Sequence, residues 1–120
     1  MLNSYRDLDV WKRSVLLVAE VYRVTRQLPS DERFGLTTQM RRASVSVTCN
    51  IAEGYGRLTR GEYMNQLSVA RGSLYELEAL SEVCQALSFL RSEDVAAVDD
   101  HLKQMRRMLR RLMESLRKRK

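Results

Sequence analysis

The amino-acid sequence predicts an all-α protein, an antiparallel four-helix bundle with up-down-up-down topology. Apolar residues recur at alternating intervals of three and four in four separate segments, which is the spacing of one face of a helix. One proline and five glycines among 120 residues argue against long linkers and against an all-β design. Because only short turns separate the four segments, neighbouring helices should pack antiparallel within a single domain formed by residues 1–120.

The first helix is expected from about Asp9 to Leu28, because Pro29 lacks the backbone N–H that a helix requires. Two apolar stripes run side by side along this segment. The first stripe is Leu8, Trp11, Val15, Val18 and Tyr22, and the second is Leu17, Val21, Val24 and Leu28. Together the stripes are wider than contact with one neighbouring helix requires. We therefore expect a second subunit to cover part of this helix.

The second helix is expected from Leu36 or Thr37 to about Gly54, where a glycine can close a helix. It contains ten consecutive residues without a charge, 43–52. In this segment Val45 and Val47 alternate with serine and threonine, which also fits a strand. A helix is favoured because a single strand would have no partner in this chain.

An uncharged helix of small side chains is typically buried on more than one side, which again indicates a second subunit. The alternative is that the serines, the threonine and the asparagine of the segment form a solvent-facing side. The residues that we expect at the subunit contact are Ala43, Val47, Asn50 and Ile51. If Glu53 is buried beside them, it needs a cationic partner. The candidates are Arg41, Arg42, Arg57 and Arg71.

Capping patterns mark the start of the third and fourth helices. Thr59 and Glu62 have the spacing of a capping box, so the third helix should begin near Arg60 and carry an apolar track as far as Leu90. Ser92 is the expected cap of the fourth helix, with acidic residues in its first turn. A heptad seam follows: Val95, Val98, Leu102, Met105, Leu109, Leu112 and Leu116.

The net charge of +6 is concentrated at the C-terminal end of the chain. Residues 1–100 carry a net charge of −2 and residues 101–120 a net charge of +8. The heptad seam places most of these cations on the outer side of the fourth helix, where only Glu114 opposes them. The expected nucleic-acid-binding residues are Lys103, Arg106, Arg107, Arg110, Arg111 and Arg117.

Such a segment can attract phosphates of RNA or DNA through release of counterions. Recognition of base sequence is not expected, because aromatic and amide side chains are nearly absent from this end of the chain. The alternatives are an ordinary solvated face, or an interaction scaffold whose basic end binds an acidic protein.

Other classes of function lack support in the sequence. The single histidine, His101, follows two aspartates and is expected at the surface, and no cluster has the spacing of metal ligands. Cys49 and Cys84 have no obvious base nearby and are expected to be reduced, unpaired and buried. We expect no enzyme activity, no metal and no cofactor. The N-terminus has no signal-peptide pattern and the longest apolar run, Val15–Ala19, is too short to cross a bilayer, which favours a cytoplasmic protein without a membrane partner.

Three segments together resemble a known family: DLDVW at residues 7–11, LTTQMRRASVSVTCNIAEGYGR at residues 36–57 and ARGSLYELEAL at residues 70–80. The chain resembles the bacterial four-helix-bundle family that includes proteins encoded within intervening sequences of 23S rRNA genes. It is also similar in architecture to the accessory variability determinant of diversity-generating retroelements. The resemblance covers roughly residues 5–90. It implies a homopentameric barrel of four-helix bundles, with nucleic acid as the expected partner and no catalytic activity.

Overall fold

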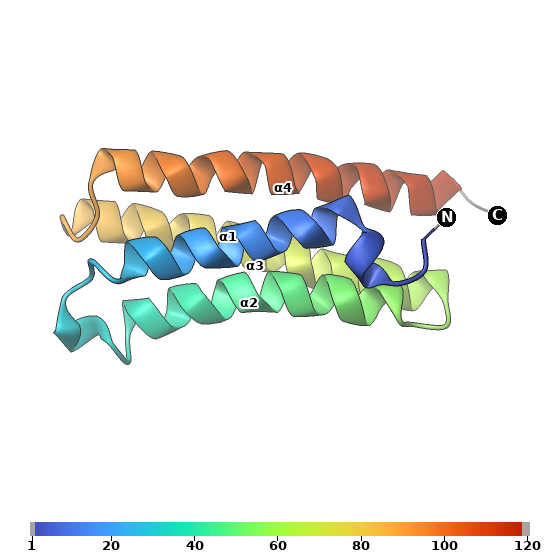
Figure 1. Cartoon of the computed structure of the whole chain (residues 1–120), viewed down its shortest axis with the longest axis horizontal. Helices are drawn as coiled ribbons and strands as arrows, with labels where there is room; N and C mark the ends of the chain where they lie inside the picture. Colours follow the sequence, from blue (N-terminus) through green and yellow to red (C-terminus); the bar gives the residue numbers. More distant parts are fainter. Residues whose placement is uncertain (1, 119–120) are drawn as a thin grey trace.

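Four long helices build the molecule, and their connections are short (Figure 1). The computed structural model describes residues 2–118. The long helices are α1 (Asp9–Thr25), α2 (Leu36–Tyr55), α3 (Arg60–Ala86) and α4 (Ser92–Lys118), and two short 3₁₀ helices are η1 (Tyr5–Asp7) and η2 (Ser30–Glu32). Successive helices run in opposite directions, which confirms the predicted all-α four-helix bundle.

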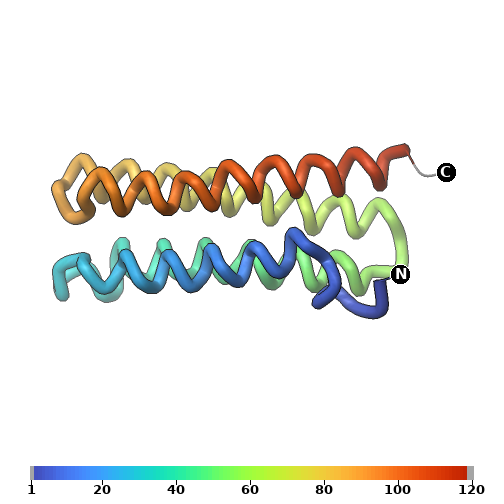
Figure 2. The backbone as a smooth tube through the Cα atoms, turned by 45° about the horizontal axis from the view of Figure 1, so that its top comes forward, coloured from blue at the N-terminus to red at the C-terminus, as the bar shows by residue number. Residues whose placement is uncertain are grey.

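The four helices form a ring in cross-section. α1 contacts α2 and α4, and α3 also contacts α2 and α4, whereas the diagonal pairs do not approach each other closely. Figure 2 shows α1 and α2 on one side of the bundle and α3 and α4 on the other. The bundle therefore has an α1–α2 face and, opposite it, an α3–α4 face.

The second apolar stripe of α1 fills the core, with Leu17, Val21 and Val24 fully buried. The first stripe is buried only in part: Leu8 belongs to the core and Trp11 packs against it, whereas Val15 and Tyr22 are exposed. Val15 is 42% exposed and Tyr22 is 37% exposed. One chain thus buries one predicted stripe in full and the other only in part.

Three of the four predicted subunit-contact residues belong to the core of their own chain. Ala43, Val47 and Ile51 are buried in the bundle, so they offer no surface to a second subunit and the prediction for them was wrong. The sequence pattern identified their burial but could not show which surface covers them. The outer side of the same uncharged segment carries Val45 and Cys49, and both are exposed.

Asn50, the fourth of these residues, is half-buried and ties α2 to α3. Its Nδ2 donates to the carbonyl oxygen of Ser46 at 2.8 Å, and its Oδ1 accepts from Nε2 of Gln66 at 2.6 Å. The same Nε2 lies 3.3 Å from Oε2 of Glu53, which is exposed. Glu53 is therefore bonded by an amide, and the proposed arginine partners are not needed. Arg57 instead donates to Oε1 of Gln66 at 2.9 Å.

The ends of the helices differ from expectation in three places. α1 ends at Thr25, three residues before Leu28, and the backbone N–H groups of Gln27 and Leu28 donate to residues three positions earlier, at 3.1 and 3.2 Å, in a tighter turn. α4 already includes Ser92, and the carbonyl oxygen of Arg91 accepts the first helical hydrogen bonds. In the last turns of α4, Met113 takes the buried position predicted for Leu112, since a straight helix drifts from a strict seven-residue repeat.

The predicted cap of α3 is present in part. The hydroxyl oxygen of Thr59 accepts from the backbone N–H of Glu62 at 3.1 Å, as in a capping box. The Glu62 carboxylate accepts from the Thr59 hydroxyl at 2.9 Å, where the capping box would place a backbone N–H as donor. One backbone donor of the first turn is therefore satisfied by the cap.

Both cysteines are free, as predicted, but only one is buried. Cys84 lies in the core with its Sγ 3.6 Å from Sδ of Met40, and burial raises the pKa of its thiol. Cys49 is exposed on the outer side of α2, which corrects the prediction that both are buried. The apolar segment around Cys49 indicated burial correctly only for the residues that face the core.

Candidate nucleic-acid interface

A surface groove runs along the α3–α4 face and has a volume of about 540 Å³. We call it the α3–α4 groove. Its lining residues are Arg71 and Tyr75 from α3 and Lys103, Arg106, Arg107, Arg110, Met113, Glu114 and Arg117 from α4. Six of these side chains are cationic and one is acidic. The groove is therefore a strongly positive surface at the boundary between two helices.

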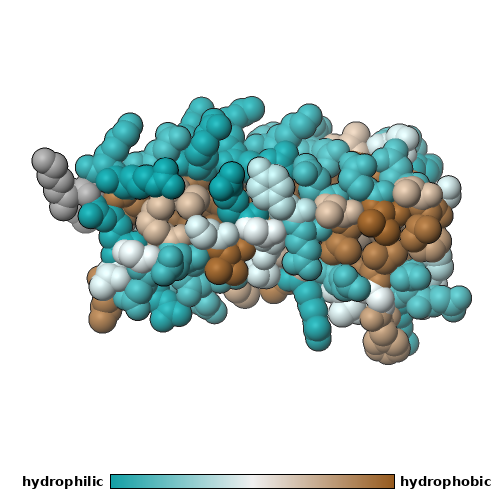
Figure 3. All heavy atoms as spheres, turned by 180° about the vertical axis from the view of Figure 1, so that it is seen from behind, coloured by the Kyte–Doolittle hydropathy of each residue, from teal (hydrophilic) through white to brown (hydrophobic). Residues whose placement is uncertain are grey.

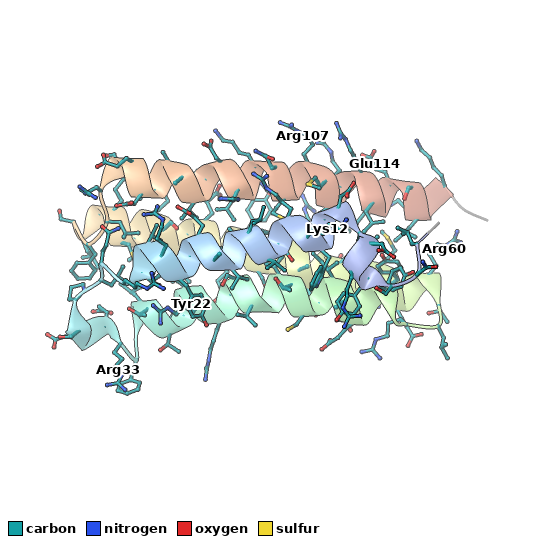
Figure 4. The ribbon with its side chains drawn as sticks, in the orientation of Figure 1. Lys12, Tyr22, Arg33, Arg60, Arg107 and Glu114 are labelled. Atoms are coloured by element: carbon teal, nitrogen blue, oxygen red, sulfur yellow. The ribbon has the colours of Figure 1, made fainter. Side chains whose placement is uncertain are left out.

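Five of the six predicted nucleic-acid-binding residues line the α3–α4 groove. The exception is Arg111, which is exposed on α4 outside the groove lining. Lys103, Arg107, Arg110 and Arg117 are separated by four, three and seven residues along α4, and this spacing places them on one face. Figure 4 shows the side chain of Arg107 projecting outward from α4, and in Figure 3 hydrophilic side chains gather along the upper edge, where α4 lies.

Arg106 differs from the other arginines of the groove because it is held within the protein. Its Nη1 lies 3.2 Å from Oε2 of Glu78, and its side chain is only 24% exposed. Its guanidinium carbon is 5.4 Å from the centroid of the Tyr75 ring. Arg106 thus connects α4 to two residues of α3.

Tyr75 is an aromatic side chain at the surface of the groove, with 47% of its area exposed. Arg71, one helical turn earlier, places its guanidinium carbon 5.7 Å from the ring centroid. The ring therefore has a guanidinium group of α3 and one of α4 within cation–π distance. Neither α3 residue was predicted for this site, because the charge pattern of the sequence identifies the basic helix alone.

Two carboxylates near the groove, Glu114 and Asp99, differ in their surroundings. Arg110 and Glu114 form an ion pair with Nε 3.9 Å from the carboxylate oxygen, and both side chains are largely exposed. At the other end, burial raises the pKa of Asp99, and the neighbouring Glu78 raises it further, whereas Lys103 and Arg106 lower it. No ion pair is formed by Arg107 or Arg117 in the part of the chain that the structure describes.

A contact between α3 and α4 supports the far end of the groove. Arg60, the first residue of α3, donates to the carbonyl oxygen of Leu116 at 3.3 Å. A cation beside the last carbonyl groups of a helix is favourable, because these groups carry partial negative charge. The bond joins the start of α3 to the end of α4 and so holds the basic helix beside its neighbour.

A second groove, of about 520 Å³, lies on the opposite α1–α2 face. It is lined by Tyr22, Thr38, Arg41, Arg42, Val45 and Ser46. The guanidinium carbon of Arg41 lies 4.4 Å from the centroid of the Tyr22 ring, and its Nε donates to Oγ1 of Thr25 at 2.9 Å. Arg41 is therefore bound within the chain, and the accessible part of this surface is largely apolar.

The described residues contain no group of three or more histidine, cysteine, aspartate or glutamate side chains placed to hold a metal ion. Within residues 2–118, no helix has the length and hydropathy needed to cross a membrane. The basic surface of the α3–α4 groove remains the most distinctive chemical feature of the molecule.

Comparisons with known proteins agree with the fold. A family model described as 23S rRNA-intervening sequence protein matches residues 6–111, which extends the similarity beyond residue 90 and into the basic helix. A crystal structure of a protein of unknown function from the S23 ribosomal protein family of Bacteroides thetaiotaomicron superposes with a TM-score of 0.80 at 18% identity. The superposition covers 87% of this chain and 97% of that chain. No curated protein sequence shows significant similarity to this chain.

Proposed function

Because the chain belongs to the family of 23S rRNA-intervening sequence proteins, we propose that it is a non-catalytic, homo-oligomeric protein that binds nucleic acid with little preference for base sequence. The observation that carries the proposal is the α3–α4 groove, whose lining combines six cations with one carboxylate. A groove of this charge can hold a sugar-phosphate backbone, because each neutralised phosphate releases counterions. The proposed ligands are RNA and DNA.

Apart from Arg106, which is paired with Glu78, the groove cations of α4 are available for phosphate contacts. Arg107 and Arg117 are exposed and have no intramolecular ion pair within the described residues. Arg110 has only the exposed ion pair with Glu114, and such pairs contribute about 0–1 kcal/mol to stability. A phosphate can therefore replace Glu114 at small cost to the folded protein.

The opposite surface supports self-association. The α1–α2 face carries the exposed apolar side chains of Val15, Tyr22 and Val45, which water covers in the single chain. Since the α3–α4 groove lies on the other side of the bundle, assembly through the α1–α2 face leaves the α3–α4 groove of every subunit accessible. The proposed assembly is the pentamer that the family resemblance implies.

Binding is tested with fluorescently labelled RNA and DNA of mixed sequence over a series of salt concentrations. The parent protein should bind both, and the logarithm of its affinity should fall with the logarithm of salt concentration. The slope is about −0.9 per phosphate neutralised on duplex DNA and about −0.7 on single strands. A variant with Arg107→Gln, Arg110→Gln and Arg117→Gln should remain folded, bind more weakly and show a shallower slope.

The matched control replaces three exposed arginines that lie outside the groove by glutamine: Arg6, Arg26 and Arg33. Its net charge equals that of the groove variant, so a general charge effect would weaken both alike. Equal affinities and equal salt slopes for the two variants would show that the groove does not bind the phosphates.

Assembly is tested by light scattering. The parent should have the mass of five copies of the 14.0 kDa chain. Val45→Arg places a charge on the α1–α2 face without entering the core and should yield a folded monomer. Val83→Arg, at an exposed position of α3, should leave the mass unchanged. A monomeric parent at micromolar concentration would contradict the oligomeric part of the proposal.

A further inference from the structure

We propose that the α3–α4 groove selects unpaired nucleic acid, with one base stacked on Tyr75 and the adjoining phosphates bound by Arg71, Arg107 and Arg110. This inference rests on the proposed function and names its ligand class, a single-stranded segment of RNA or DNA. It follows from the combination of an exposed aromatic ring with cations on both helices of one groove.

The position of Tyr75 is suited to stacking. Nearly half of the side chain is exposed, although the residue lies in a groove between two packed helices. Aromatic side chains at such positions stack on the faces of bases, and every base offers a π-face, so this contact requires no particular sequence. The ring therefore adds a contact to bases that the surrounding arginines cannot provide by charge alone.

Arg106 acts as a positioning residue for this ring. Its ion pair with Glu78 at 3.2 Å and its limited exposure keep the guanidinium beside Tyr75, with 5.4 Å between guanidinium carbon and ring centroid. The cation–π contact restrains the ring before any ligand is present. Because its charge is already balanced by Glu78, Arg106 is not expected to bind a phosphate.

The remaining cations follow the groove on either side of the ring. Arg71 approaches the ring from α3, while Lys103, Arg107, Arg110 and Arg117 lie along α4. From Lys103 to Arg117 the helix rises roughly 21 Å, at about 1.5 Å per residue. This length suits a segment of several nucleotides, which is the scale of other single-strand sites.

A paired duplex cannot use the ring in the same way. Its bases are stacked on one another and paired, so their faces are closed to a side chain that lies in a groove on a protein surface. Unpaired nucleotides expose those faces and can turn a base toward an aromatic side chain. A duplex would therefore contact only the cations, whereas a single strand would contact the cations and Tyr75 together.

The test compares Tyr75→Leu, which removes the aromatic ring, with Tyr75→Phe, which keeps it. The probes are a labelled single strand of about 20 nucleotides and mixed sequence and its duplex, a length we choose to exceed the groove. Tyr75→Leu should weaken single-strand binding by about tenfold, in line with the loss of one base–aromatic stack. Duplex binding should stay within about twofold of the parent, and Tyr75→Phe should behave as the parent on both probes.

Phe34→Leu is the matched control, because Phe34 is also an exposed aromatic beside an arginine and lies outside the groove. It is 85% exposed, and the guanidinium carbon of Arg33 lies 5.1 Å from its ring centroid. Its replacement should leave both affinities unchanged. As a second readout, a single strand that contains photoreactive 5-iodouracil should crosslink to the peptide that carries Tyr75.

The outcomes separate this inference from the proposed function. If Tyr75→Leu weakens both probes equally or neither, while binding still depends on the groove arginines, the stacking site is wrong and the proposed function stands. If the parent binds neither probe at low salt, both fail. A crosslink on peptides outside the groove would also overturn the assignment of Tyr75.

Discussion

Gly54 of α2 lies directly against the ring of Tyr63 from α3. A Cβ atom at Gly54 would be 2.9 Å from Cδ1 of Tyr63 and 3.0 Å from Cβ of Gln66, which is closer than such atoms pack. Tyr63 also packs edge-on against Tyr55, with 6.4 Å between ring centroids. Since α2 and α3 form the most extensive contact in the bundle, this close approach helps to set how the two helices meet.

Gly54→Ala should therefore destabilise the protein by about 1–3 kcal/mol, the usual cost of overpacking. Urea denaturation measures the change. Gly72→Ala is the matched control, because Gly72 lies within α3 and a Cβ atom added there would meet no atom within 4 Å. At that position the better helix propensity of alanine should stabilise the protein by up to about 1 kcal/mol. Effects of the same sign at both positions would refute the packing argument.

The hydrogen bond between Gln66 and Asn50 supports a second prediction. Gln66→Ala leaves Oδ1 of the half-buried Asn50 without its 2.6 Å donor, and an unsatisfied partly buried acceptor costs about 1–3 kcal/mol. The free energy of unfolding should fall by that amount in urea titrations. Gln104→Ala changes an exposed glutamine of α4 and should have an effect of less than about 0.5 kcal/mol. Equal losses for the two variants would show that the α2–α3 link contributes nothing.

Much of the fold could be predicted from sequence because its determinants are local. Periodic apolar residues, the cap at Thr59 and the stop at Pro29 identified the four helices to within a few residues. The core stripe of α1 and nearly all of the heptad seam of α4 are buried as expected. Which side of α2 packs against the other helices of its own chain depends on tertiary structure. Ala43, Val47 and Ile51 were therefore predicted at a subunit contact, although they lie in the core.

The candidate site was predictable only on the helix that carries the charge. The cations of α4 follow from composition and the heptad seam, whereas Arg71 and Tyr75 belong to a helix of mixed charge. Their pairing with α4 depends on the register across the short turn that contains Phe89. Tyr75 and Lys103 are equally distant from Phe89 in the sequence, so two antiparallel helices joined by this turn place these residues at the same level. This symmetry could have predicted that α3 residues near Tyr75 lie beside the cations of α4.

The two cysteines should differ in reactivity. Cys84 is buried and its raised pKa lowers the thiolate fraction, so a thiol reagent should modify it only after denaturant is added. Cys49 lies one helical turn from Val45 on the outer side of α2. Its labelling should be faster in the monomeric Val45→Arg variant than in the assembled parent. Mass spectrometry of the labelled peptides distinguishes the sites, and rapid modification of Cys84 in the native parent would contradict its burial.

His101 gives the stability of the protein a dependence on pH. The residue is half-buried between α4 and α1 instead of lying at the surface, and burial lowers its pKa below the ordinary value of 6.5. Arg13 lowers the pKa further, while Glu20 and Asp100 raise it, and Nδ1 of His101 has no hydrogen-bond partner among the described residues. Folding therefore favours the neutral imidazole.

Because the unfolded chain binds a proton at higher pH than the folded chain does, the contribution of His101 is fully present above about pH 6.5 and is lost as the pH falls below it. His101→Gln removes this titration and keeps a polar side chain of similar length. The difference in unfolding free energy between variant and parent, measured in urea from about pH 7.5 to about pH 5.5, should shift steadily in favour of the variant as the pH falls. Both proteins share every other titrating group, so those contributions cancel. A difference that is constant over this range would mean that the histidine titrates alike in the folded and unfolded states.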